Sequence, residues 1–294
     1  MELRKLKCLL LPLALSLVIL TFAGCTQATT PTTTTSTTTT TTSTQSSTTS
    51  ELSGTITEAG STTVQPLAEK LAAAFTAKNP KVKVTVQGGG SSVGIKSTAE
   101  GTIDIGAASR ELTVEEETMV ITHVLAKDGI AIVIHPTNSV NNLTKAQVKD
   151  IFAGVITNWK DVGGVDSPIN IVSREEGSGT RGAFEELVMG KDAQISATAI
   201  LQPSNGALRT TVAGDPDAIG FLSFGYLDAS VKALSIDGVA GMPDNAKNGT
   251  YPIVRPLLFL TKTEPTGLVK AFLDFCTSDE GQKLIVDEGY LSIK

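Results

Sequence analysis

Four short segments of the chain carry the apolar patterning of β-strands. Residues 81–87 (KVKVTVQ) alternate apolar and polar side chains with a period of two, as in a strand with one well-buried face. Residues 129–135, 169–173 and 253–261 are short and mostly apolar, which is typical of strands covered on both faces. The pattern therefore predicts a sheet that is covered by other elements on its two sides.

Helical spacing separates some of these strand segments. Apolar residues recur at intervals of three and four over 64–75 and again over 143–152, where Thr144 is placed to cap the helix. The stretch 237–250 is rich in Gly, Asp and Asn and predicts a loop. Strands that alternate with helices indicate an α/β fold.

The first 25 residues have the layout of an export signal. Three cations within the first seven residues precede an apolar run over 8–22, which is too short to span a bilayer comfortably, and small residues follow it. Residues 22–25 (FAGC) resemble a lipoprotein processing site, at which Cys25 would become the lipidated first residue. We expect a protein held at the outer face of the cytoplasmic membrane by this anchor. An ordinary signal peptide with an incidental cysteine is the alternative.

Residues 26–50 differ sharply in composition from the rest of the chain. Of these 25 residues, 21 are Thr or Ser, and none is charged or carries a large apolar side chain. Such a segment has too little apolar surface to form a core of its own. We therefore expect a disordered stalk over 26–52 and a globular part from residue 53 onward.

Composition excludes several kinds of site. The only histidines are His123 and His135, and no His/Cys cluster has the spacing of metal ligands, so we expect neither a metal nor a cofactor. Cys276 lies in an apolar-periodic stretch and predicts a buried, inert thiol. The net charge is −6, and aromatic residues make up 4% of the chain, which argues against nucleic-acid binding.

Three clusters of glycine and hydroxyl residues stand just before predicted helices: residues 60–63 (GSTT), 88–92 (GGGSS) and 177–180 (GSGT). Serine or threonine at a helix start can cap the helix or donate a hydrogen bond outward, and glycine lets a ligand approach the backbone. The free N–H groups of a first helical turn also attract anions. Capping alone explains any one cluster, but three in one chain predict an anion site.

Arg174 is the predicted ionic contact of this site. It follows the strand 169–173 and so emerges at the carboxyl end of a strand, where open α/β sheets bind ligands. Arg110 and Arg181 are further candidates, because a guanidinium group can form two parallel hydrogen bonds with an oxyanion. Either arginine can instead pair with a neighbouring glutamate, and for Arg181 we favour that ion pair.

An enzyme is the main rival hypothesis. Residues 90–94 (GSSVG) fit the G-x-S-x-G nucleophile elbow, with Ser92 as the nucleophile of a serine hydrolase. That fold places its catalytic histidine late in the chain, yet no histidine follows His135. Glu175 and Glu176 are chain neighbours and make no better glycosidase pair. We therefore expect no catalytic activity, and a purely structural surface protein would leave the three clusters unexplained.

From about residue 54 to its end, the chain resembles the phosphate-binding component of phosphate ABC transporters. The motifs that carry the resemblance are GSTTVQPLAEKLAAAF, VQGGGSSVGIKSTAEGTIDIGAASREL, GIAIVIHP, LTKAQVKDIFAGVITNWKDVGG, IVSREEGSGTR and IGFLSFGY. The resemblance implies the type II periplasmic-binding-protein fold, with two α/β lobes joined by a hinge. Lobe one would comprise 53–128 and 255–294, and lobe two 129–254. It also implies a monomer that passes inorganic phosphate to a membrane permease.

The resemblance also implies which residues bind phosphate. They are Ser61, Thr62, Thr63, Ser91, Ser92, Ser109, Arg174, Ser178, Gly179 and Thr180. Well-known members of the family have an aspartate in place of Ser109, and it accepts the proton that phosphate carries and sulfate lacks. A serine hydroxyl can also accept a hydrogen bond, so phosphate remains the expected ligand. Another tetrahedral oxyanion, such as sulfate, is the alternative.

Overall fold

The computed structural model describes residues 51–294. The predicted signal peptide, Cys25 and nearly all of the predicted stalk lie outside the described residues, so these expectations stay predictions. Within 51–294, every helix is too short or too polar to cross a bilayer.

One nine-stranded sheet runs through the described residues. Its order is β2-β1-β3-β12-β4-β8-β6-β7, with β9 paired to β4 in addition. The strands are β1 (Gly54–Gly60), β2 (Val82–Gln87), β3 (Ile105–Ala108), β4 (Ile121–Ile134), β6 (Asn170–Arg174), β7 (Ile200–Gln202), β8 (Ala218–Ser223), β9 (Lys232–Ala233) and β12 (Val254–Thr261). The four predicted strands are confirmed as β2, β4, β6 and β12, although β4 begins at Ile121, well before the predicted residue 129.

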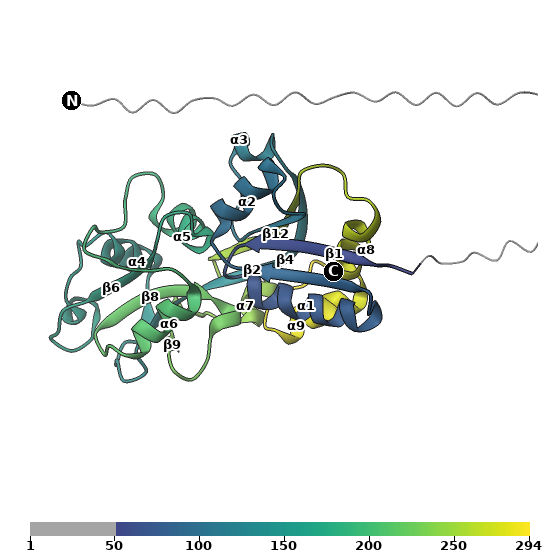
Figure 1. Cartoon of the computed structure of the whole chain (residues 1–294). Helices are drawn as coiled ribbons and strands as arrows, with labels where there is room; N and C mark the ends of the chain where they lie inside the picture. The colour runs from purple at the N-terminus through teal and green to yellow at the C-terminus, as the bar shows by residue number, and fades with distance from the viewer. Residues whose placement is uncertain (1–50) are drawn as a thin grey trace, which may run out of the picture. The chain divides into compact units, whose positions relative to one another are not determined.

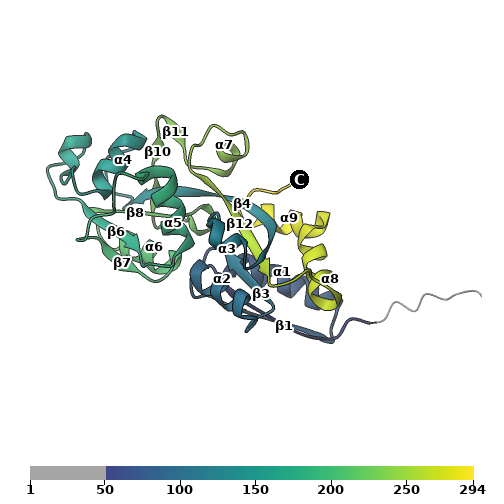
Figure 2. The same ribbon diagram turned by 90° about the horizontal axis from the view of Figure 1, so that it is seen from above.

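Helices cover the sheet, and a small second sheet accompanies it (Figures 1 and 2). The helices are α1 (Gln65–Lys78), α2 (Ser91–Glu100), α3 (Val114–Glu117), α4 (Lys145–Phe152), α5 (Gly179–Phe184), α6 (Asn205–Ala213), α7 (Pro243–Lys247), α8 (Gly267–Thr277) and α9 (Asp279–Asp287). Shorter elements are the helical turns η1 (Trp159–Val162), η2 (Glu185–Met189) and η3 (Phe224–Tyr226), and the three strands β5 (Asn142–Leu143), β10 (Ser235–Ile236) and β11 (Val239–Ala240).

The two predicted helices form as α1 and α4. Thr144 caps α4 as expected: its side chain accepts the N–H of Gln147, and the Gln147 side chain accepts the N–H of Thr144. The predicted loop over 237–250 is wrong in part, because it contains β11 and α7. Pro243 stands in the first turn of α7, where its fixed φ angle suits a helix and its missing N–H is not needed.

Buried apolar side chains gather in two large clusters. One draws on residues 56–126 and 257–290, and the other on residues 130–253 together with Leu291. We call the parts of the chain around them lobe one and lobe two. The boundaries predicted from the sequence, at 128/129 and 254/255, stay predictions. Trp159 is fully buried in the lobe-two cluster.

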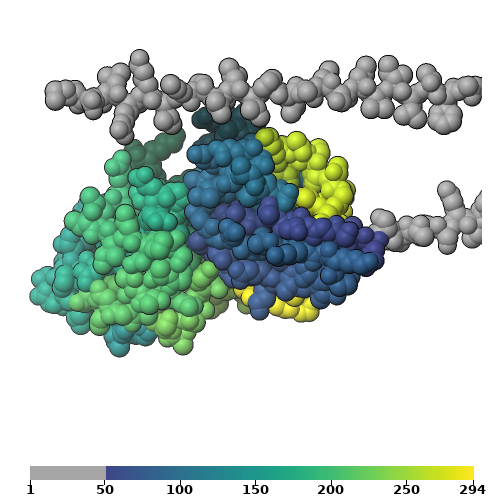
Figure 3. Space-filling view, in the orientation of Figure 1, coloured from purple at the N-terminus to yellow at the C-terminus, as the bar shows by residue number. Residues whose placement is uncertain are grey.

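The strand β4 belongs to both lobes. Its residues from Ile121 to Gly129 pair with β12, and those from Ile130 to Ile134 pair with β8. Figure 2 shows β4 running from the side of β8 to the side of β12. In the space-filling view, the green and teal surface of lobe two meets the blue surface of lobe one along a seam (Figure 3). The carboxyl ends of β1, β3 and β6 and the start of β12 lie close together, because Arg174 donates to Thr62 Oγ1 and Arg255 donates to the carbonyl of Ser109.

Candidate oxyanion-binding site between the lobes

Nearly all of the predicted ligand residues lie together in the buried region between the lobes. Nine of the ten are buried, namely Ser61, Thr62, Thr63, Ser91, Ser109, Arg174, Ser178, Gly179 and Thr180. The exception is Ser92, whose side chain is exposed and whose N–H donates to the carbonyl of Gly177 over 3.1 Å. Ser92 therefore makes a backbone contact between the lobes and stands outside the buried cluster.

The first loop turns directly from β1 toward α1. The N–H of Ser61 donates to the carbonyl of Ala107 (2.9 Å), and its Oγ accepts the N–H of Thr63 (3.1 Å). Gly60 has a φ angle of 144°, and a Cβ there would lie 2.3 Å from the Ala107 carbonyl oxygen, so only glycine fits. The residue before α1, Val64, has no side-chain cap. Ser61 Oγ also accepts the N–H of Val64 (3.4 Å), so Ser61 caps the turn that leads into α1, whereas the hydroxyls of Thr62 and Thr63 accept hydrogen bonds from other residues.

Three serines connect the loops of lobe one. Ser61 Oγ donates to Ser109 Oγ over 2.8 Å, and the N–H of Ser109 donates to Ser91 Oγ over 3.1 Å. The start of α5 presses against them from lobe two: a Cβ on Gly179 would lie 2.1 Å from Ser91 Oγ and 2.6 Å from Ser109 Oγ. Glycine is required here because the two lobes approach so closely.

At the start of α5, a hydroxyl caps the first residues of the assigned helix directly. Ser178 Oγ accepts the N–H of Arg181 over 3.2 Å, whereas α1 and α2 have no side-chain cap at their first residues. The N–H groups of Gly179 and Thr180 belong to the first turn of α5 and have no acceptor within the helix. They are available to an anion between the lobes.

Arg174 is a buried cation with incomplete hydrogen bonding. Its side chain is 1% exposed; Nε donates to the carbonyl of Gln202 (2.9 Å), and Nη2 donates to the carbonyl of Pro203 (2.9 Å) and to Thr62 Oγ1 (3.3 Å). Among residues 51–294, Nη1 has no partner, and no carboxylate forms an ion pair with this arginine. Burial and the nearby Arg255 lower the pKa of Arg174 to about 10, so it keeps its charge at neutral pH.

The other two candidate arginines are held by glutamates. Arg110 forms two hydrogen bonds with Glu116, of 2.7 and 2.8 Å. Arg181 pairs with Glu185 over 2.8 Å, as expected, and its Nη1 donates to the carbonyl of Arg174 over 3.2 Å. Neither guanidinium therefore matches Arg174 as a free positive charge.

Sequence reasoning missed a buried ion pair beside the site. Arg255 on β12 and Asp128 on β4 are 3% and 0% exposed, and Nε and Nη2 of Arg255 donate to Asp128 Oδ2 over 3.1 and 2.8 Å. Arg255 also donates to the carbonyl of Ser109 (3.0 Å) and to Thr63 Oγ1 (3.1 Å). Burial raises the pKa of Asp128, and the Arg255 guanidinium opposes that rise. A charged residue inside the apolar run 253–261 was the signal for Arg255.

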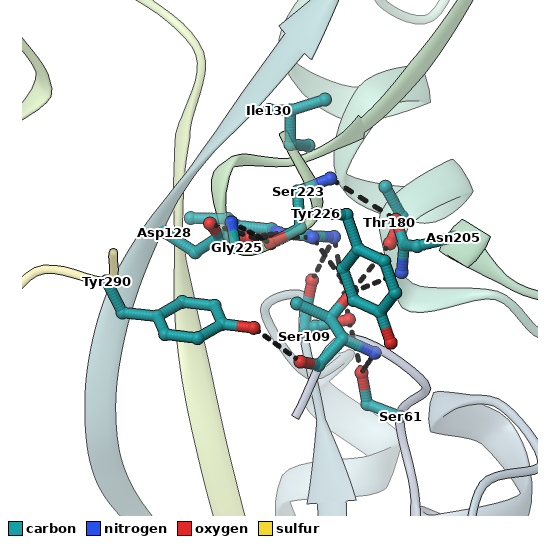
Figure 4. Close-up of polar contacts among 12 residues, drawn as sticks. Ser61, Ser109, Asp128, Ile130, Thr180, Asn205, Ser223, Gly225, Tyr226 and Tyr290 are labelled. Carbon is teal, nitrogen blue, oxygen red and sulfur yellow. Dashed lines mark hydrogen bonds and ion pairs between the residues drawn. The ribbon is translucent and has the colours of Figure 1, made fainter. Parts of the chain in front are cut away.

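Three further polar residues reach the first loop and were also missed. Asn205 Nδ2 donates to Thr63 Oγ1 over 2.9 Å, and Tyr226 Oη donates to the carbonyl of Thr62 over 2.7 Å. Tyr290 Oη donates to the carbonyl of Thr63 over 3.0 Å (Figure 4). Tyr226 lies within the motif IGFLSFGY, but spacing alone gave no reason to place its hydroxyl at this loop.

The histidines do not complete a serine-hydrolase site. His123 Nε2 lies 2.8 Å from Thr261 Oγ1, and His135 Nδ1 lies 2.7 Å from Thr137 Oγ1. Neither ring is hydrogen-bonded to Ser92. No group of three or more His, Cys, Asp or Glu side chains within residues 51–294 is arranged to hold a metal ion.

The charged residues buried between the lobes are Arg174, Arg255 and Asp128. Two positive charges against one negative charge leave a net positive charge there, which suits an anion.

Comparison with known proteins identifies the family. A model described as the PBP superfamily domain matches residues 26–280. The phosphate-binding protein PstS of Bacillus subtilis is 38% identical over 248 residues, which cover 82% of this chain and 81% of that protein. PstS of Borreliella burgdorferi is 31% identical over 251 residues, covering 81% and 90%.

Solved structures give the same result. A phosphate ABC transporter substrate-binding protein with bound phosphate from Clostridium perfringens is 42% identical, with a TM-score of 0.80 and coverage of 82% of this chain and 100% of that one. A phosphate transport receptor from Vibrio cholerae is 40% identical, with a TM-score of 0.69 and coverage of 81% and 100%. The expected type II fold is thereby confirmed. The chain belongs to the PBP superfamily and, within it, to the phosphate-binding components of phosphate ABC transporters.

Proposed function

We propose that the protein captures inorganic phosphate outside the cytoplasm and passes it to the permease of an ABC transporter. The observation that carries the proposal is Arg174, a buried guanidinium without a carboxylate partner and with one N–H group unsatisfied. A buried charge is strongly destabilising unless an opposite charge compensates it. A dianion seated between the lobes would supply that charge.

The ligand would be held by fixed donors from both lobes. Arg174 Nη1 and the N–H groups of Gly179 and Thr180 face it from lobe two, and the hydroxyls of Thr62 and Ser91 face it from lobe one. These groups would replace the water that phosphate loses when the lobes close. Ser61, Thr63, Ser109 and Ser178 orient the donors through the hydrogen bonds described above, and Ser92 contributes its backbone contact with lobe two.

Phosphate differs from sulfate at neutral pH in carrying a proton, which needs an acceptor. Ser109 Oγ accepts a short hydrogen bond from Ser61 (2.8 Å) and a long one from Arg255 Nη1 (3.5 Å). Arg255 Nη1 lies closer to the Ser109 carbonyl (3.0 Å) than to Oγ (3.5 Å). The long bond from Arg255 is the one that the phosphate proton would replace, because Nη1 keeps the Ser109 carbonyl as its acceptor. We propose that Ser109 fills the role which a carboxylate has elsewhere in the family.

The remaining features follow from the same assignment. The protein acts without catalysis, as a monomer, and reaches the permease from a lipid anchor at Cys25. The relatives named above are binding proteins, which supports a role in capture. The overall negative charge of the chain disfavours long-range attraction of anions, so short-range donors must provide the affinity.

Titration calorimetry with phosphate, arsenate, sulfate and molybdate tests the proposal. We expect phosphate to bind far more tightly than sulfate. Replacing Arg174 with alanine should weaken phosphate binding by about 10- to 150-fold, the range for losing a hydrogen bond to a charged group. Lys160→Ala removes an exposed cation of lobe two and should leave the affinity unchanged. Equal binding of phosphate and sulfate would contradict the phosphate assignment, and no binding of any oxyanion would contradict the receptor function.

A further inference from the structure

Five buried polar residues form a closed ring of hydrogen bonds beside the proposed phosphate site. Arg255 Nη2 donates to Thr63 Oγ1 (3.1 Å) and to Asp128 Oδ2 (2.8 Å), and Ser223 Oγ donates to Asp128 Oδ1 (3.0 Å). The N–H of Ser223 donates to Asn205 Oδ1 (3.2 Å), and Asn205 Nδ2 donates to Thr63 Oγ1 (2.9 Å), which closes the ring. Figure 4 shows Asn205, Ser223 and Asp128 at this position.

The ring crosses from one lobe to the other. Thr63 stands in the loop between β1 and α1 of lobe one, whereas Asn205 begins α6 and Ser223 ends β8, both in lobe two. Asp128 and Arg255 are direct cross-strand partners on β4 and β12, where the chain passes between the lobes. The bond between Asn205 and Thr63 can therefore exist only while the lobes are close together.

All five residues of the ring are buried, at most 3% exposed. If the lobes separated, Asn205 Nδ2 and Thr63 Oγ1 would lose their mutual hydrogen bond and would have to bind water instead. The orientation of the Asn205 amide is fixed, because its oxygen must accept the backbone N–H of Ser223 and its nitrogen must then face Thr63.

The ring also fixes the direction of one hydroxyl proton. Thr63 Oγ1 accepts hydrogen bonds from Arg255 and Asn205, which occupies both of its lone pairs. Its own proton must then point to Thr180 Oγ1, 3.0 Å away. The Thr180 hydroxyl is thereby left with its proton free to donate to an oxyanion between the lobes.

We infer that Asn205 and the Arg255–Asp128 pair are positioning residues, which hold the lobes closed on the oxyanion and set Thr180 as a hydrogen-bond donor. The inference rests on the proposed capture of phosphate between the lobes. Asn205 is not itself assigned to the ligand: Nδ2 donates to Thr63 Oγ1 (2.9 Å) and, over a longer distance, to Thr62 Oγ1 (3.5 Å), and Oδ1 accepts the N–H of Ser223. Its effect should accordingly fall on how long the closed form lasts, more than on how fast phosphate enters.

Stopped-flow measurement of phosphate association and release tests this role on the full-length protein. Asn205→Ala should raise the release rate by about tenfold, the loss of one net hydrogen bond at a buried site, and leave the association rate nearly unchanged. Asn170→Ala is the matched control, because Asn170 Nδ2 bonds to Asp215 (2.8 Å) within lobe two, and its release rate should equal that of wild type. Asn205→Asp replaces the amide donor with an acceptor and should abolish high-affinity binding.

Small-angle X-ray scattering without phosphate gives a second readout, which separates this inference from the proposed function. The ring predicts a larger radius of gyration for Asn205→Ala than for wild type and the control variant. If wild type binds no phosphate, the proposed function is wrong. The scattering comparison would still show whether Asn205 holds the two lobes together. An Asn205→Ala protein with wild-type scattering and wild-type release would overturn it.

Discussion

At the scale of single residues, the site depends on how two buried arginines are compensated. Arg255 has Asp128 as a counter-ion, with N–O distances of 2.8 and 3.1 Å, and so forms part of the protein framework. Arg174 has three oxygen partners but no carboxylate, so its charge is left for a ligand. The same side-chain chemistry thus serves two different purposes, and the position of one aspartate decides which.

Another buried ionisable residue, Glu58, lies on β1 away from the arginines. It is 2% exposed, and neither of its carboxylate oxygens has a hydrogen-bond partner among the described residues. Burial, and then the nearby Glu69, raise its pKa well above the ordinary value. In the unfolded chain the same group ionises near pH 4.5, so folding disfavours its charged form.

We therefore expect Glu58→Gln to stabilise the protein at neutral pH. The wild-type carboxyl is neutral in both states at pH values below its unfolded pKa, so the two proteins should differ little there. As pH rises from about 4.5 toward the raised folded pKa, wild type should lose stability relative to the variant. Urea unfolding between pH 4 and 8 measures this difference, with the exposed Glu100→Gln as the control. A constant difference across that range would contradict the prediction.

At the scale of elements, the start of α5 packs tightly against lobe one. Ser178 caps the helix, and Gly179 leaves room for Ser91 and Ser109 of the opposite lobe. The three glycine and hydroxyl clusters look alike in sequence but differ in role. Ser178 of the third cluster caps α5 and Ser61 of the first caps the turn before α1, whereas Ser91 of the second accepts the N–H of Ser109.

Gly179→Ala should weaken phosphate binding by roughly 5- to 150-fold, the effect of overpacking a closed contact. The added Cβ would lie 2.1 Å from Ser91 Oγ, so the lobes could not close fully. Gly206→Ala in α6 is the matched control, because its Cβ would meet nothing closer than 3.8 Å. Calorimetry on both variants measures the effect. Wild-type affinity in Gly179→Ala would show that the lobes need not approach this closely.

At the scale of the whole described molecule, two apolar cores are joined by a strand that belongs to both. Because β4 pairs with β12 on one side and with β8 on the other, the two lobes share one sheet. The site residues come from both lobes, so a ligand there contributes to the stability of the joined structure. Phosphate should therefore protect the protein against heat.

At phosphate concentrations of about 100 times Kd, linkage predicts roughly 2.7 kcal/mol of added stability. For a chain of this size that corresponds to a rise in Tm of roughly 5–10 °C. Differential scanning calorimetry should show the full rise for wild type and at most about half of it for Arg174→Ala at the same phosphate concentrations, because the variant binds more weakly. An equal rise in both proteins would place the stabilising phosphate somewhere other than at Arg174.

The sequence by itself predicted the α/β class, four strands of the nine-stranded sheet, and an anion site made of the three glycine and hydroxyl clusters and Arg174. Local signals suffice for these predictions, because the apolar periodicity, the residues at a helix start and the ends of the strands all depend on residues that are neighbours in the sequence. The resemblance added the family, the full set of ten ligand residues, of which nine are buried between the lobes, and the lobe boundaries that it implies. The loop predicted over 237–250 failed in part, because a proline at the start of α7 outweighed the polar composition of that stretch.

Only the tertiary structure decided which arginine is compensated and which is free. Asp128 and Arg255 are 127 residues apart in sequence, and Asn205 and Thr63 are 142 apart. Contacts between residues so far apart in sequence depend on the order of the strands in the sheet, and local sequence patterns do not determine that order. The fold also placed Ser92 outside the buried cluster, although it directly follows the buried Ser91. The sequence indicates which groups can donate a hydrogen bond to an anion. The tertiary structure determines which of these groups remain without a partner inside the protein and are free to bind one.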